Sequence, residues 1–119
     1  MKRQVSLENY KAFIKPIKGN DYMSVNGRIQ MAHDDHEAQD ARLDILTEYL
    51  GDYVFKATVI SSLYGTATGH AQNHPKQTGS TAQDTNPMED AETSAVGRAL
   101  ANLGYGILEK GIASYEEVR

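Results

Sequence analysis

The sequence contains no cysteine and no tryptophan, and only three of its 119 residues are proline. The lack of cysteine excludes disulfide bonds and thiolate zinc sites and agrees with a reducing compartment. No stretch approaches the roughly 18 apolar residues of a membrane-spanning helix. Met1-Lys2-Arg3 leads into polar sequence rather than into the apolar part of a signal peptide. We therefore expect one cytoplasmic domain, residues 1–119, that does not contact a membrane.

Positive charge is scarce overall and unevenly distributed. The formal net charge of −4 argues against a generally basic nucleic-acid-binding surface. Residues 1–33 nevertheless hold six basic and two acidic residues, and residues 53–83 hold two lysines and no acid. Segments 34–52 and 84–119 hold seven acids each. The two cationic zones are either two sides of a groove for a polyanion or an ordinary fluctuation of surface charge.

The hydrophobic pattern predicts a sheet built from strands that are neighbours in sequence. Period-two alternation predicts a half-buried strand over 21–33, with a bulge at Gly27, after a short helical turn over 7–15. Alternation resumes over 43–49 and 53–60, joined by a turn at Gly51-Asp52, and a further strand is expected over 66–71. The expected fold is mainly β with one long helix: a curled antiparallel sheet whose exposed edges favour a homo-oligomer.

The long helix is expected after the strands. Asn86 and Pro87 suit its cap and first position, acidic residues follow in the first turn, and Gly104 supplies a left-handed stop, so the predicted helix covers 87–103. Its apolar stripe of small residues suits close packing on a sheet. The polar residues 72–86 before it predict a flexible loop, and residues 105–112 after it predict a short strand.

Patterns for catalysis or metal binding are incomplete. His33-Asp34-Asp35-His36 contains ligand-type side chains, but neighbours in an extended segment point in opposite directions. His70 and His74 would need a helical turn that the adjoining glycine and proline disfavour. The chain has no phosphate-binding glycine loop with its lysine and no nucleophile elbow. We expect a non-enzymatic protein with no metal or other cofactor.

Binding of a single strand needs cations that follow the phosphates and rings on which bases stack. If Phe55, Ala57 and Val59 face the core, the residues between them face a ligand. The candidate contacts lie on such polar strand faces and in the cationic zones: Lys18, Tyr22, Asn26, Arg28, Lys56, Thr58, Tyr64, Thr68, His70 and Lys76. Each has a structural alternative, since a strand tyrosine more often packs in the interior. Arg98, within the helix, is expected to be a structural partner of a carboxylate or carbonyl.

Residues 86–106 (NPMEDAETSAVGRALANLGYG) resemble a motif of phage recombination-module proteins that bind or anneal single strands. Residues 18–28, 54–58 and 67–71 resemble the same proteins in the same order. In length and sequence the chain is most similar to the single-stranded DNA-binding proteins of lactococcal phages. That resemblance implies a variant of the oligonucleotide/oligosaccharide-binding (OB) barrel. It also implies sequence-nonspecific binding and protection of single-stranded DNA in phage replication and recombination, in the cytoplasm of the infected bacterium. A phage annealing protein or a host recombinase is then an expected partner.

Two departures from that resemblance leave alternatives open. The helix of the usual barrel follows its third strand, whereas here it follows four predicted strands. The short end at 115–119 lacks the acidic tail with an apolar hook by which such proteins recruit partners. One alternative is a strand-annealing or recombination-mediator protein. Another is a protein-interaction module that uses the acidic segments 34–52 and 107–117.

Overall fold

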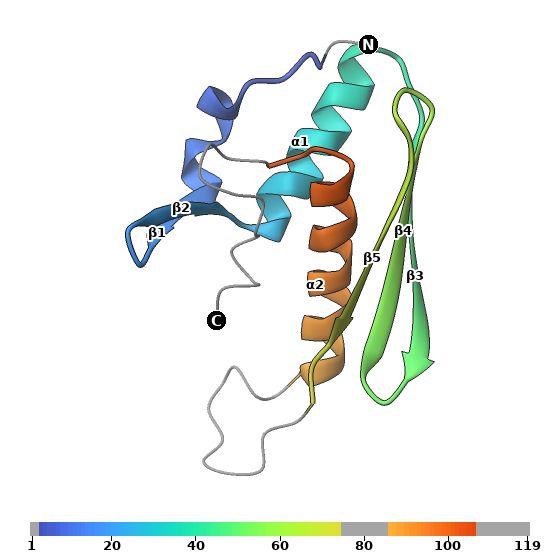
Figure 1. Cartoon of the computed structure of the whole chain (residues 1–119). Coiled ribbons are helices and arrows are strands. Elements are labelled where there is room, and N and C mark those ends of the chain that lie inside the picture. The colour runs from blue at the N-terminus through green and yellow to red at the C-terminus, as the bar shows by residue number, and fades with distance from the viewer. Residues whose placement is uncertain (1–2, 75–85, 107–119) are drawn as a thin grey trace.

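A computed structural model describes residues 3–74 and 86–106 of the chain (Figure 1). All strand pairs are antiparallel and form two separate sheets, β1-β2 and β3-β4-β5. The elements in chain order are η1 (Leu7–Phe13), β1 (Ile14–Ile17), β2 (Asn20–Met23), α1 (Val25–Ala38), β3 (Leu43–Gly51), β4 (Val54–Ser61), β5 (Gly65–Gln72) and α2 (Pro87–Asn102). The fold is therefore mixed α/β, and the described strands close no barrel.

The second half of the expected strand over 21–33 is a helix, α1, so that prediction was wrong. Val25, Ile29 and Ala32 recur at the spacing of one helix face. Val25 and Ile29 also fit the alternating pattern of a strand, which explains the error. The Ser24 hydroxyl caps the helix, because it accepts a hydrogen bond from the backbone N–H of Gly27 at 3.2 Å. Gly27 forms no bulge: a Cβ there would collide with Phe13, which packs against the helix.

Three of the four strands predicted for the antiparallel meander form the β3-β4-β5 sheet, and the first, over 21–33, is not part of it. β4 pairs with β3 and with β5, and Phe55, Ala57 and Val59 on β4 face the core as expected. Helix α2 packs across β4 and β5, and α1 packs against α2. Gly69 permits that close approach, since a Cβ there would lie 2.5 Å from the backbone nitrogen of Ala99. In Figure 1 the two helices lie between this sheet and the β1-β2 hairpin.

Helix α2 also confirms its sequence signals. Pro87 occupies the first turn, Glu89 and Asp90 follow it, and Gly104 adopts a φ of 107° after the helix ends. Asn86 is the residue at the N-cap, although its side chain makes no capping hydrogen bond. The small-residue stripe is fully buried against the sheet and α1.

Two predictions fall largely outside the described residues. The structure does not describe residues 75–85 of the flexible loop expected over 72–86. It also does not describe residues 107–112 of the strand expected over 105–112. The short helical turn expected near 7–15 is the 3₁₀ helix η1. Within the described part of the chain, no helix is long and apolar enough to cross a membrane.

Candidate nucleic-acid interface

Four predicted contact residues share the outer face of the three-stranded sheet. Lys56 and Thr58 alternate with the core residues of β4, and they pair in register with His70 and Thr68 of β5. This side of the sheet points away from both helices (Figure 1). The alternation inferred from the sequence therefore brought these four side chains together correctly.

The outer sheet face has little positive charge. Glu48 of β3 lies opposite Lys56 in register. Asp44, four residues earlier on the same face of β3, lies opposite Ile60. The other side chains of β3 on this face are the exposed Leu46 and Leu50, of which Leu46 is 55% exposed. A neutral, partly aliphatic face offers a phosphate backbone only weak attraction.

Cations and a ring instead gather on the β1-β2 hairpin. Lys15 lies directly opposite Tyr22, so the two side chains point to the same face of the hairpin. Lys18 and Gly19 form its turn with φ values of 52° and 83°, which places an exposed lysine at the tip. Lys11 stands just before it in η1 and pairs with Glu8 at 3.0 Å, an exposed contact that costs little to break.

The predicted contact residues that lie on the hairpin and on the outer sheet face therefore form two groups on opposite sides of the molecule. Figure 1 shows the hairpin on one side of the helices and the open sheet on the other. Asn26 belongs with the hairpin, since it is exposed in the first turn of α1 directly after β2. Lys76 lies outside the described residues.

Arg28 is a structural residue, which corrects its assignment as a ligand contact. It lies on the buried face of α1 with none of its surface exposed, and its Nη1 donates to the backbone carbonyl of Tyr105 at 3.0 Å. The misassignment follows from the strand prediction, which placed Arg28 on a polar face. Arg98 confirms its structural interpretation by donating from Nη1 to the carbonyl of His70 at 2.6 Å.

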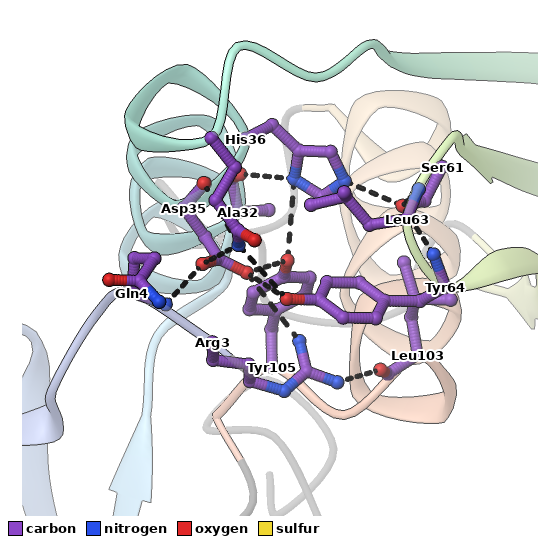
Figure 2. Close-up of polar contacts among 11 residues, drawn as sticks. Arg3, Gln4, Ala32, Asp35, His36, Ser61, Leu63, Tyr64, Leu103 and Tyr105 are labelled. Carbon is purple, nitrogen blue, oxygen red and sulfur yellow. Dashed lines mark hydrogen bonds and ion pairs between the residues drawn. The ribbon is translucent and has the colours of Figure 1, made fainter. Parts of the chain in front are cut away.

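Tyr64 is half-buried, and its hydroxyl bonds within the fold, which disfavours its prediction as a platform for bases. Figure 2 shows it pointing with Tyr105 toward the buried carboxylate of Asp35, which accepts hydrogen bonds from the two hydroxyls at 2.9 and 2.6 Å. The backbone N–H of Gln4 donates to the same carboxylate at 2.6 Å. The guanidinium of Arg3 lies 4.4 and 4.3 Å from the two tyrosine ring centroids.

The electrostatics of this Asp35 cluster stabilise an ionised aspartate. Burial by itself raises the pKa of Asp35, but the hydrogen bonds from Gln4, Tyr105, Tyr64 and Gln39 outweigh it and hold the pKa below its ordinary value. Burial, together with the neighbouring carboxylate, raises the pKa of Tyr105. The cluster joins the N-terminal segment, α1, the turn after β4 and the end of α2. This cluster was not predicted from the sequence. Asp35 follows Ala32 by three residues and Arg28 by seven, a spacing that places all three on one face of a helix and would have indicated a buried carboxylate.

Among the described residues, His36 and Ser61 form a contact that resembles a catalytic pair. Their Nε2 and Oγ atoms lie 2.6 Å apart, and Nδ1 of His36 lies 2.8 Å from the carbonyl of Ala32. The Ser61 oxygen, however, also accepts from the backbone N–H groups of Leu63 and Tyr64 at 3.1 and 3.0 Å. Both side chains are buried, so the pair fastens the β4-β5 turn to α1. Among the residues that the structure describes, no three metal-ligand side chains converge.

Comparison with known proteins finds a matching family. The model of the Slr1353 N-terminal dsRNA-binding domain-like family matches residues 31–103, which run from α1 through the three-stranded sheet to the end of α2. No curated protein and no solved structure matches the chain significantly. The β1-β2 hairpin precedes the matched region.

Proposed function

The chain belongs to the Slr1353 N-terminal dsRNA-binding domain-like family, and we propose that it binds single-stranded DNA without sequence preference through the β1-β2 hairpin. Family membership supports nucleic-acid binding in general. The choice of strand form and of surface rests on the hairpin itself. The proposal is of a binding protein without a catalytic step.

The observation that carries the proposal is the pairing of Lys15 with Tyr22 beneath the lysine at the hairpin tip. The Tyr22 ring is half-buried, and its exposed part offers a surface on which an unstacked base can lie, while the adjacent ammonium groups can follow the phosphates. Aromatic stacking tolerates every base, which explains the expected lack of sequence preference.

Charge disfavours a duplex as the main ligand. Double-stranded RNA is contacted across successive grooves and the phosphates between them, which requires cations spread over a long surface. The N-terminus of α2 would be a natural phosphate site, but its first turn carries Glu89 and Asp90. The second half of α1 carries Asp34 and Glu37. A short cationic hairpin in an acidic protein suits a flexible single strand better.

The number of lysines on and beside the hairpin sets the expected salt dependence. Lys11, Lys15 and Lys18 can neutralise about three phosphates, which predicts a slope of about −2 in log affinity against log salt for a single strand. A fourfold rise in salt would then weaken binding roughly fifteenfold. A slope near zero would contradict a phosphate-based site.

The direct experiment is a fluorescence titration of labelled single-stranded DNA, single-stranded RNA and double-stranded RNA at low salt. We expect the tightest binding to single-stranded DNA, and weaker binding with Lys15→Ala, Lys18→Ala and Tyr22→Ala at unchanged melting temperature. Lys56→Ala on the outer sheet face is the matched control and should bind as the unchanged protein does. Tighter binding of the duplex, or loss of binding only in Lys56→Ala, would overturn the proposal.

The resemblance of residues 86–106 extends the proposal to phage DNA replication and recombination, with a phage annealing protein or host recombinase as protein partner. Annealing of complementary strands is the second candidate, favoured by the same motif. In the fold, however, that motif is α2, whose small residues are used in packing. An annealing assay with complementary oligonucleotides separates strand annealing from simple protection.

A further inference from the structure

The two edges of the β3-β4-β5 sheet differ in how they are protected. At β5, side chains of α2 bond the backbone: Asn102 donates to the carbonyl of Thr68 at 2.7 Å and Arg98 to that of His70 at 2.6 Å. At β3, no described side chain bonds the outer backbone edge. One edge of the sheet is covered by a helix, and the other is open to a further strand.

Three large hydrophobic side chains are exposed along this open strand. Leu46, Tyr49 and Leu50 of β3 are 55%, 47% and 48% exposed, and they are three of the five large hydrophobic side chains with high exposure among the described residues. β3 is nine residues long and contains no lysine or proline, but it carries Asp44 and Glu48 and a register shift between Tyr49 and Gly51. The strand therefore favours pairing with another strand in a register that keeps these carboxylates apart.

We propose that β3 pairs antiparallel with β3 of a second copy of this chain, about a two-fold axis at Thr47, to make one six-stranded sheet. The sequence of β3 is self-complementary in that register. Thr47 lies opposite its own copy, and Ile45 lies opposite Tyr49 on the side that faces the helices. Pairs of aromatic with β-branched residues are favourable between antiparallel strands, and the Thr47 hydroxyl keeps its hydrogen bond to Glu92 of α2.

Charge selects this register over its neighbours. With the axis at Thr47, Glu48 lies opposite Leu46 of the second copy, so that no two carboxylates face each other. Moving the axis to Leu46 would place Asp44 opposite Glu48 twice, and moving it to Glu48 would place that glutamate opposite itself. Like charges directly opposite destabilise a strand pair. Registers further out shorten the paired length.

The pairing is independent of what the hairpin binds, because β3 and the hairpin lie on opposite sides of the helices (Figure 1). A dimer would nevertheless carry two hairpins on one body. Two linked sites raise the apparent affinity for one long strand when its length lets both engage.

The test measures the mass of the full chain by light scattering, after nuclease treatment and without added nucleic acid. We expect twice the 13.1 kDa of one chain. Leu46→Glu, which places a carboxylate opposite Glu48 of the second copy, should halve that mass. Thr58→Glu is the matched control, since Thr58 lies on the same sheet face but on the central strand, opposite Leu46 and Thr68. A monomeric unchanged protein, or a dimer unaffected by Leu46→Glu, overturns the proposal.

Cysteine cross-linking tests the register separately. Because the chain has no cysteine, a single introduced thiol reports one contact only. Thr47→Cys should form an intermolecular disulfide under mild oxidation, since opposed residues of paired strands bring their Cβ atoms close. Thr68→Cys, exposed on the covered edge strand β5, should stay monomeric under the same conditions. Cross-linking at Thr68 but not at Thr47 would contradict the proposed interface. Circular dichroism confirms that each variant is folded.

Discussion

Replacing Asp35 with asparagine tests the importance of the Asp35 cluster for stability. The carboxylate has no exposed surface and accepts hydrogen bonds from Gln4, Gln39, Tyr64 and Tyr105. Asparagine keeps the shape and one oxygen, but its NH₂ group faces donors and cannot accept from them. Asp35→Asn therefore leaves buried hydroxyl or N–H groups without an acceptor.

The magnitude follows from these contacts. A hydrogen bond to a charged group contributes about 1.5–3 kcal/mol, and a buried donor left without a partner costs a similar amount. Two of the donors to Asp35 are the hydroxyls of the buried Tyr105 and the half-buried Tyr64, so we expect the free energy of unfolding to fall by about 3 kcal/mol. At this chain length that corresponds to a decrease of roughly 12 °C in melting temperature.

The assay is thermal and urea unfolding at neutral pH, followed by circular dichroism. Glu37→Gln is the control, because Glu37 is exposed on the same helix and its change should stay within about 0.5 kcal/mol. A loss in Asp35→Asn of less than about 1 kcal/mol would refute our account of the cluster.

The pH dependence adds a second criterion. Hydrogen bonds hold the pKa of Asp35 below its ordinary value in the folded protein. Its contribution to stability is therefore complete above about pH 4 and is lost as the pH falls through the folded pKa. The unfolding free energies of the unchanged protein and Asp35→Asn should converge in acid. A constant difference between pH 7 and pH 3 would contradict this mechanism.

Three further outcomes are expected. Arg28→Ala should lower the melting temperature by several degrees, because it removes a buried cation that bonds the Tyr105 carbonyl, and nucleic-acid titration of the folded fraction should show unchanged affinity. Gly69→Ala should destabilise the fold by about 1–3 kcal/mol in urea unfolding, since the new methyl group meets the backbone at Ala99. Burial and the nearby Asp34 carboxylate raise the pKa of Tyr10 to about 12, so its contribution should be lost as the pH rises above about 10, and Tyr10→Phe should lose less stability over that range.

The strands from residue 43 onward and helix α2 were predictable because their signals are local. Alternation on β4 separated Phe55 from Lys56, and the turn at Gly51-Asp52 placed the hairpin. Pro87 and Gly104 marked the limits of α2. Such signals depend on backbone preferences and on one buried face, which a short window of sequence contains.

Helix α1 and the site residues tied to it were not predictable in the same way. The stretch around Arg28 satisfied parts of two periodicities, and packing on α2 and Phe13 decided between them. The error carried over to Arg28, which became a supposed ligand contact. Tyr64 was misplaced for a related reason, since its partner Asp35 lies 29 residues away in the chain.

The sequence by itself determined a cysteine-free, acidic chain with cationic zones, three strands of the predicted four-stranded meander, and the helix that follows them. Only the tertiary structure decided that the cations of the hairpin and those of the sheet lie on opposite sides of the helices. It also decided which tyrosines are interior and which sheet edge is open. The physical reason is that composition and periodicity are local, whereas a surface is formed by residues distant in the chain that packing brings together.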